Sequence, residues 1–116
     1  MADQDCIFCK IVEGNIPASV VYKDDRCIAF NDIEPQAPTH ILVIPRVHIE
    51  SLDTAGEDQK ELIGHLMLTA AKIARDKGFS DAGYRVVANT NADGGQTVFH
   101  LHVHLLGGRV FVFPPG

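Results

Sequence analysis

Hydrophobic residues in the first half of the chain gather in short runs bounded by polar residues, as β-strands require. Two such runs, 18–23 and 27–30, are separated by the turn signal Asp24-Asp25, and together they predict a β-hairpin. A third run, 40–45, is almost continuously apolar. Such a run predicts a strand at a buried, central position of a sheet.

The middle of the chain has the period of an amphipathic helix. Apolar residues recur at three- and four-residue spacing between Leu62 and Ala74. The sequence Thr54-Ala55-Gly56-Glu57 has the spacing of a capping box, and Gly78 stands where a helix would end. We therefore predict a helix over about residues 57–77.

Two further strands are predicted in the second half, over 84–90 and 99–106, with a turn-rich segment at 91–95 between them. Strands joined by short turns favour antiparallel pairing, and one long helix must cover one face of the sheet. The predicted fold class is therefore α+β. With 116 residues and no visible repeat or linker, we expect a single domain over 1–116.

The composition is that of a globular protein, with 46% hydrophobic and 22% charged residues. The formal net charge of -5 argues against a general nucleic-acid partner, which would need a basic face. No apolar run approaches the roughly 18 residues of a membrane span, so no membrane partner is expected. Residues 1–5 are acidic and unlike a secretory signal or transit peptide, so we expect a cytoplasmic protein.

The densest chemical signal is the alternation of His100, His102 and His104 with aliphatic residues. In a strand, such alternation places the three histidines on one face and the aliphatic side chains on the other. Solvent-facing polar positions would be served as well by Thr, Lys or Glu. Histidine is the residue of proton transfer and metal ligation, so we interpret this triad as a chemical site.

Two chemical interpretations are open for the triad. A His-x-His pair can chelate a catalytic zinc ion if a third ligand and an open position exist, whereas a neutral imidazole can itself be the nucleophile. Gly94 and Gly95 would allow backbone N–H groups to approach phosphate oxygens, although a simple turn explains them equally well. No carboxylate of the kind that a cupin-type metal site uses follows the pair, because 105–109 is Leu-Leu-Gly-Gly-Arg.

Outside the triad, the cysteines are the main candidates for chemistry. Cys6 and Cys9 have Cys-x-x-Cys spacing, and in a reducing compartment they are a candidate redox or metal-binding pair. Cys27 lies in an apolar run and is expected in the core. His65 is expected to be a packing residue of the predicted helix, and Arg109 an exposed surface arginine.

The segment 94–109, Gly-Gly-Gln-Thr-Val-Phe-His-Leu-His-Val-His-Leu-Leu-Gly-Gly-Arg, resembles the histidine triad (HIT) family, and within it the Hint branch of histidine triad nucleotide-binding proteins. Other matching segments follow in the same order along the chain: 8–11, 29–33, 35–40, 44–45, 64–67, 83–85 and 114–116. The resemblance implies a HIT-like fold over 1–116, with about five antiparallel strands, one long and one short helix. It also implies a homodimer whose two sheets join into one.

The resemblance implies a nucleoside phosphoramidase. Such an enzyme cleaves the P–N bond of purine nucleoside 5'-phosphoramidates, such as adenosine 5'-phosphoramidate or aminoacyl-adenylate-like compounds, to a nucleoside monophosphate and an amine. His102 matches the nucleophile that forms a covalent nucleotidyl-histidine, His104 the group that donates to phosphate or leaving group, and His40 and His100 supporting catalytic residues. The matched nucleotide-binding positions are Asp32, Ile33, Asn89, Gly95, Thr97, His102 and His104.

Zinc-bearing relatives imply a structural zinc site, and its ligands here would be Cys6, Cys9, His48 and His100. Four protein ligands leave no open position, so such a zinc ion would be structural. No catalytic metal and no organic cofactor are expected. Two reduced core cysteines or a redox pair are the alternatives.

Two other functions remain open. One is hydrolysis of dinucleoside polyphosphates, as in another HIT branch. The other is a nucleotide-binding scaffold without an enzymatic role. Gly107-Gly108-Arg109 and the ending Pro114-Pro115-Gly116 favour the phosphoramidase branch.

Overall fold

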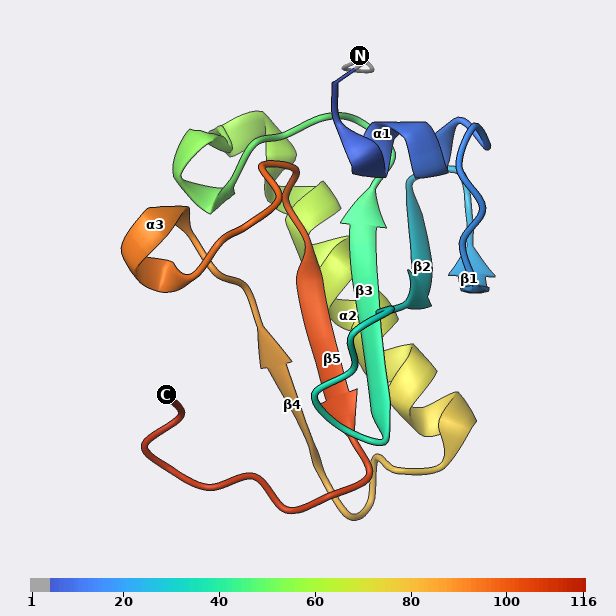
Figure 1. The fold of residues 1–116 in the computed structure, drawn as a ribbon, viewed down its shortest axis with the longest axis vertical. Coiled ribbons are helices and arrows are strands. Elements are labelled where there is room, and N and C mark those ends of the chain that lie inside the picture. Colours follow the sequence, from blue (N-terminus) through green and yellow to red (C-terminus); the bar gives the residue numbers. More distant parts are fainter. Residues whose placement is uncertain (1–4) are drawn as a thin grey trace.

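In the computed structural model, which describes residues 5–116, an antiparallel sheet carries helices on both of its faces (Figure 1). The helices are α1 (Ile7–Val12), α2 (Lys60–Lys77) and α3 (Asn91–Gly94), and the strands are β1 (Val20–Lys23), β2 (Cys27–Asn31), β3 (Thr39–Pro45), β4 (Tyr84–Val87) and β5 (Val103–Gly107). The strand order is β1-β2-β3-β5-β4. The predicted α+β class, with five antiparallel strands and one long helix, is confirmed. Residues 1–4, part of the acidic start on which the expectation about targeting signals rests, lie outside the described residues.

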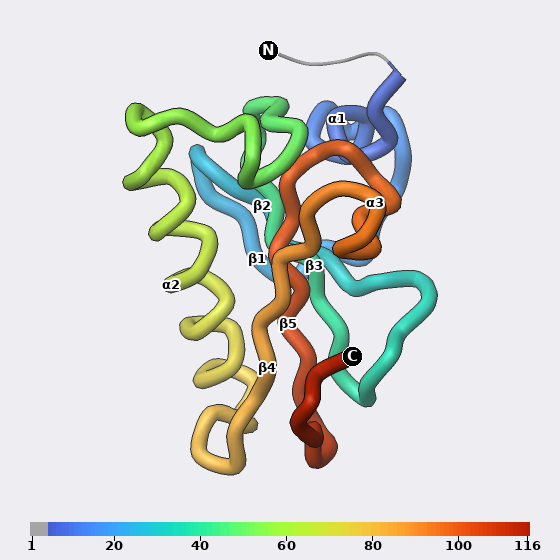
Figure 2. The backbone as a smooth tube through the Cα atoms, turned by 90° about the vertical axis from the view of Figure 1, so that its left-hand side faces the viewer, coloured from blue at the N-terminus to red at the C-terminus, as the bar shows by residue number. Residues whose placement is uncertain are grey.

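Strand β3 lies at the centre of the sheet, between β2 and β5. Its residues alternate between two hydrophobic clusters: Ile41 and Val43 pack toward α2, while Leu42 and Ile44 pack toward α1. Figure 2 shows α2 on one side of the sheet and α1, α3 and the 32–38 loop on the other. Because both faces are covered, the strand is apolar at nearly every position, as its sequence predicted.

Helix α2 covers one face of the sheet and ends as predicted, but it begins differently. Gly78 has a φ of +86°, and its N–H donates to the Ala74 carbonyl, which terminates the helix. The predicted cap at Thr54 is wrong, because the Thr54 hydroxyl instead accepts from the Ser51 N–H at 3.2 Å. A 3₁₀ turn over Glu57–Gln59 precedes the α-helix.

The two strands predicted in the second half are too long. Strand β4 ends at Val87 and not at residue 90, and β5 begins at Val103 and not at residue 99. The last β3–β5 pair is Val43 with Val103, and before it the Leu101 N–H donates to the Ile49 carbonyl at 2.6 Å. The segment predicted as a turn, 91–95, contains the short helix α3.

The alternation of side chains nevertheless continues through the segment before β5. Leu101, Val103 and Leu105 are buried in the cluster beneath α2. His100 and His102, although they precede the strand, lie on the face that carries α1, because Phe8 packs against both rings. The histidines therefore share one face, as the sequence predicted, although the segment before β5 is not a continuous strand.

Asp24 joins the β1–β2 turn to helix α2. One of its carboxylate oxygens accepts from the backbone N–H groups of Arg26 and Cys27, and the other accepts from Tyr22 and from His65 Nε2 at 2.7 Å. Burial raises the pKa of Asp24, but these hydrogen bonds outweigh that effect and hold it below its usual range. His65 therefore fastens the helix to the hairpin turn.

None of the helices among residues 5–116 combines the length and the apolar character needed to cross a membrane.

The alternation around β5 predicts that replacing two adjacent leucines with alanine lowers the free energy of unfolding by different amounts. Leu105 is 0% exposed beneath α2, whereas Leu106 is half-buried on the opposite face. We expect Leu105→Ala to lower the free energy of unfolding by about 2–5 kcal/mol, because it leaves a cavity in the core. Leu106→Ala is the matched control and should cost clearly less. Urea denaturation measures both changes, and equal losses would contradict the assignment of faces.

Candidate active site and metal cluster

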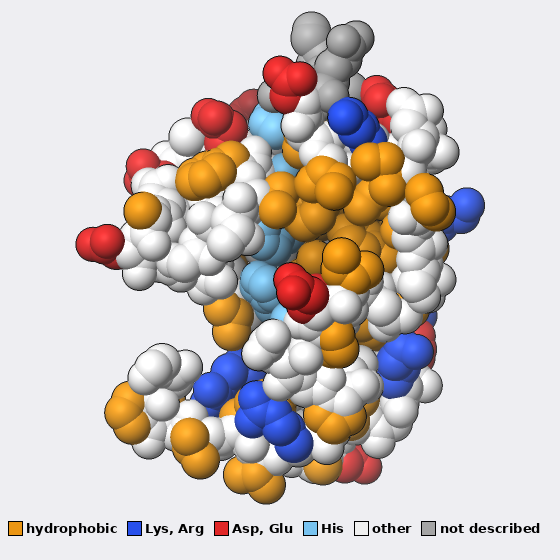
Figure 3. Space-filling view, in the orientation of Figure 1, with side chains coloured by type: hydrophobic (Ala, Val, Ile, Leu, Met, Phe, Trp, Pro, Cys, Tyr) orange, Lys and Arg blue, Asp and Glu red, His pale blue; other side chains and the backbone are white. Residues whose placement is uncertain are grey.

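A pocket of about 490 Å³ lies on the sheet face opposite α2. Figure 3 shows histidine side chains lining a hollow, with hydrophobic side chains gathered along one side of it. The apolar wall comes mainly from α1, the segment that follows it and the sheet; its members include Ile7, Phe8, Ile11, Ile16, Pro17, Ala18, Phe30 and Leu42. The polar part includes Asp32, Thr97, His102 and His104.

His102 is held as a neutral imidazole with one nitrogen engaged. Its Nδ1 lies 2.7 Å from the backbone oxygen of His100, so Nδ1 carries the proton and donates it. Burial lowers the pKa of His102, which favours the neutral ring at pH 7. Nε2 then keeps its lone pair, and the side chain lines the pocket. This is the state in which an imidazole is a nucleophile.

A chain of hydrogen bonds orients His40 and His104. The Gln36 N–H donates to His40 Nδ1 at 3.0 Å, so neutral His40 carries its proton on Nε2. That proton faces His104 Nδ1 at 2.9 Å, which leaves the His104 proton on Nε2. Asp32 is beside them, with an oxygen 3.4 Å from His40 Nε2. A single backbone amide thus sets the tautomer of two histidines.

The Nε2 atom of His104 is buried and, among the described residues, has no hydrogen-bond partner. Burial lowers the pKa of His104 to about 4, and it also lowers the pKa of His40, where the Asp32 charge partly opposes the effect. A buried donor without a partner is costly in a folded protein. The His104 side chain lines the pocket, while its Nε2 atom is itself buried.

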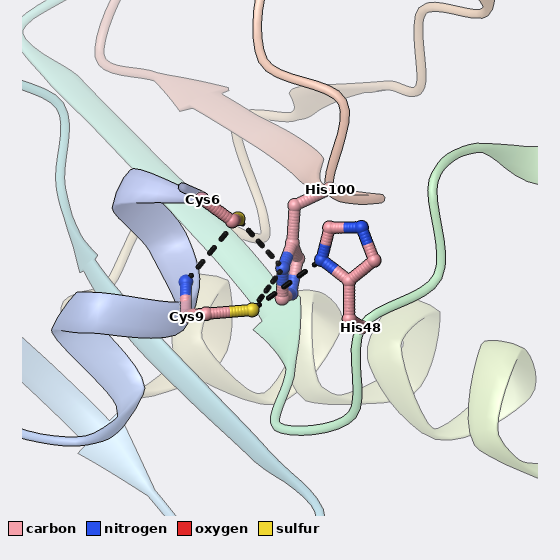
Figure 4. A group of neighbouring side chains, drawn as sticks. All are labelled: Cys6, Cys9, His48 and His100. Atoms are coloured by element: carbon pink, nitrogen blue, oxygen red, sulfur yellow. Dashed lines mark hydrogen bonds between the residues drawn. The ribbon is translucent and has the colours of Figure 1, made fainter. Parts of the chain in front are cut away.

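Four potential metal ligands, Cys6, Cys9, His48 and His100, gather beside the pocket (Figure 4), and we call this group of side chains the metal cluster. Cys6 Sγ is 3.4 Å from His100 Nδ1, and Cys9 Sγ is 3.3 Å from His48 Nδ1 and 3.5 Å from His100 Nδ1. A tetrahedral zinc ion with ordinary bond lengths places sulfur and nitrogen ligands about 3.6 Å apart. The four residues lie close enough to hold a metal ion.

His100 is prepared for ligation by its surroundings. It is 0% exposed, and burial lowers its pKa to about 4, so the ring is neutral at pH 7. Its Nε2 donates to the Pro45 carbonyl at 2.9 Å, which leaves the lone pair on Nδ1, the nitrogen that faces both sulfurs. Such a hydrogen bond commonly fixes the tautomer of a metal-binding histidine.

The structure brings most of the expected nucleotide-binding residues together, with two exceptions. Asp32, Ile33 and Thr97 line the pocket, as do His102 and His104. Asn89 and Gly95 do not line it. Gly95 has a φ of +84° and ends helix α3.

The resemblance implied a short helix, but no sequence pattern located α1, and none pointed to the backbone of Gln36. The apolar spacing of Ile7, Phe8 and Ile11 is helical but spans too few residues to identify a helix from sequence. The Gln36 N–H has no side-chain signal at all. Arg109 is exposed, as expected, and donates to the Gln36 carbonyl at 3.0 Å, so it supports this loop.

Comparisons with known proteins agree on a family. Residues 13–111 match the HIT domain. A purine nucleoside phosphoramidase of Escherichia coli strain K12 is 47% identical over 106 residues, which cover 91% of this chain and 89% of that protein. A HIT family hydrolase from Legionella pneumophila is 50% identical with a TM-score of 0.94, over 96% of this chain and 99% of that one. A zinc-bound histidine triad family protein from Mycobacterium smegmatis is 31% identical with a TM-score of 0.77, over 90% of this chain and 75% of that one.

The burial of His104 predicts a low protonation midpoint. In a proton–carbon NMR titration, with the signal assigned through His104→Gln, we expect His104 to titrate near pH 4. An unfolded histidine titrates near pH 6.5, so the unfolded chain binds more protons between these values. The contribution of His104 to the free energy of unfolding should therefore decline as the pH falls from about 6.5 toward 4. A midpoint near 6.5 would contradict the burial argument.

Proposed function

This chain belongs to the HIT domain family, and from that membership we propose that it hydrolyses the P–N bond of purine nucleoside 5'-phosphoramidates. The substrates would be adenosine 5'-phosphoramidate and aminoacyl-adenylate-like compounds, and the products a nucleoside monophosphate and an amine. One observation carries the proposal: the side chains of neutral His102 and of His104 line the same pocket.

The pocket has the features that a nucleotide needs. Phe8 and Leu42 belong to an apolar wall that would pack against the flat purine ring. Asp32 would accept hydrogen bonds from the ribose hydroxyls, and the Thr97 hydroxyl would contact the phosphate. Ile33 is 95% exposed at the pocket rim and would cover the base.

For Asn89 and Gly95 the proposed contacts to phosphate and ribose rest on the family resemblance alone, because neither residue lines the pocket.

The proposed reaction proceeds in two displacements at phosphorus. Nε2 of His102 attacks the α-phosphorus, the P–N bond breaks, and the leaving nitrogen takes a proton from His104, so that a neutral amine departs. His104 would first take up that proton from solvent, because the negative charge of the bound phosphate raises the pKa of the adjacent His104 imidazole. Water then attacks the same phosphorus, the bond to His102 breaks, and one proton returns to solvent. Before the reaction, His40 holds His104 in the tautomer that carries its proton on Nε2.

We also propose that the protein is a homodimer formed along strand β4. This strand is at an edge of the sheet, and an open edge needs a cover. The tail that follows the sheet exposes Val110, Val112 and Phe113. These apolar side chains would gain from burial against a second copy.

The reaction is tested with adenosine 5'-phosphoramidate. The wild-type protein should release AMP, and His102→Ala should reduce the rate by about a thousandfold or more, because the nucleophile is lost. His65→Gln is the matched control: it also removes a histidine, but one on α2 that does not line the pocket, and it should retain activity.

Three other results would each exclude the proposal. Equal AMP release by the wild type and His102→Ala would show that His102 is not the nucleophile. Faster cleavage of a dinucleoside polyphosphate in the same assay would favour the other HIT branch. Tight AMP binding without turnover of either substrate would favour a scaffold role.

We propose that the metal cluster holds a structural zinc ion. Two thiolates and two imidazoles are the donors that zinc prefers, and the sulfur–nitrogen distances suit a tetrahedral arrangement. When bound, zinc would cross-link the start of α1, the loop after β3 and the segment before β5. With four protein ligands it would have no open position for a substrate.

Zinc occupancy is tested by metal analysis of protein purified without chelators. The wild type should contain one zinc ion per chain, and Cys9→Ser should lose it together with part of its thermal stability, because metal binding stabilises the folded state. Cys27→Ser is the matched control, since Cys27 is equally buried but lies outside the metal cluster. It should keep its zinc, and equal zinc contents in the two variants would refute the assignment.

A further inference from the structure

Phe8 connects the metal cluster to the pocket. It lies on α1 between Cys6 and Cys9, and it is only 6% exposed. Its ring meets the ring of His102 edge-on, with centroids 5.1 Å apart and an interplanar angle of 89°. The ring also meets those of His100 at 5.9 Å and Phe30 at 5.6 Å. One side chain thus packs against a metal-cluster residue and the proposed nucleophile.

We propose that Phe8 is a positioning residue for His102 and that zinc in the metal cluster holds Phe8 in place. Occupancy of the metal cluster would then control the orientation of the nucleophile, although no residue of that cluster touches the reacting atoms. The inference rests on the proposed function, because the residue that is positioned is the proposed nucleophile.

Helix α1 depends on interactions outside itself. It has six residues, which is far too short for a stable isolated helix in water. Cys6 precedes it and accepts the Cys9 N–H at 3.3 Å, so the turn that carries Phe8 begins and ends at a metal-cluster sulfur. Fixing both sulfurs on one ion would fix that turn. Releasing them would leave apolar contacts as the main restraint on the Phe8 ring.

A second connection reaches His102 through the backbone. His100 presents Nδ1 to the two sulfurs and donates Nε2–H to the Pro45 carbonyl. The backbone oxygen of the same residue accepts from His102 Nδ1 at 2.7 Å. The ring contact and the tautomer-setting hydrogen bond of His102 therefore both come from residues attached to the metal cluster.

The first part of the test separates positioning from substrate binding. Phe8→Leu keeps an apolar wall but removes the ring edge that meets His102. We expect kcat to fall roughly two- to tenfold with little change in KM, the range of one aromatic pair. The NMR signals of the His102 ring should shift, while the zinc content should stay unchanged.

Phe30→Leu is the matched control, because Phe30 lines the same pocket and packs on Phe8. It should raise KM and leave the His102 signals nearly unchanged. If Phe8→Leu changes only KM, or leaves the His102 ring signals where they were, Phe8 is no more than a wall of the pocket and the inference fails.

The second part tests control by the metal. Zinc is removed from the wild-type protein with a chelator and then restored, while amide hydrogen exchange over residues 7–12 and the His102 ring signals are followed. Removal should speed exchange in α1 and shift the His102 signals in the same direction as Phe8→Leu, and restoring zinc should reverse both. Cys27→Ala should respond to the chelator as the wild type does, because Cys27 lies outside the metal cluster.

Unchanged exchange and unchanged ring signals after zinc removal would overturn the inference, as would a wild-type protein that takes up no zinc. These measurements need no substrate. They are therefore distinguishable from a failure of the proposed function. In that case, zinc-loaded protein would neither bind AMP nor cleave the phosphoramidate.

Discussion

The antiparallel pairing of β3 with β5 is the constraint on which the rest of the site depends. In its register Leu42 lies opposite His104, and His40 lies opposite Leu106. His40 and His104 are therefore diagonal neighbours on one face, within reach of each other's ring nitrogens. A slip of one residue would turn His104 toward α2 and break this contact. The large aliphatic side chains beneath α2 oppose such a slip, because they would lose their burial.

The two faces of the sheet differ in composition: one is aliphatic, and the other carries the histidines and the pocket. The face under α2 is filled with aliphatic side chains and carries stability. The other face carries the imidazoles, the pocket and α1 together with a second hydrophobic cluster, and a few specific hydrogen bonds orient its histidines. Burial lowers the pKa of His102 and of His104 and favours their neutral forms. Under the proposed function, His102 would be a neutral nucleophile, and a protein with a net charge of -5 would hold phosphate without a basic surface. The cost of that arrangement is His104 Nε2, a buried nitrogen without a hydrogen-bond partner in residues 5–116.

The metal cluster and the pocket share a boundary. Cys9 of helix α1 and Cys6, which precedes the helix, supply two sulfurs to the metal cluster, and the helix supplies an apolar wall to the pocket. His100 belongs to the metal cluster, and its backbone oxygen accepts a hydrogen bond from His102. A short helix of this kind has little stability of its own, so its position reflects what it is attached to. In this fold it is attached to a potential metal site.

The sequence by itself determined which side chains share a face, because periodicity is a local property. The continuous apolar run of β3, the helical period of α2 and the alternation of the triad were all readable, and the Cys-x-x-Cys pair was a candidate redox or metal-binding pair. The ends of elements were not readable: β5 starts at Val103 only because the preceding backbone turns to Ile49.

Only the tertiary structure decided which residues that are far apart in the sequence come into contact. It brings Cys9 to His48 and His100 over 39 and 91 residues, it places the Gln36 amide on His40, and it leaves Asn89 and Gly95 outside the pocket. The physical reason is that local patterns specify faces, while distances between segments come from how those faces pack.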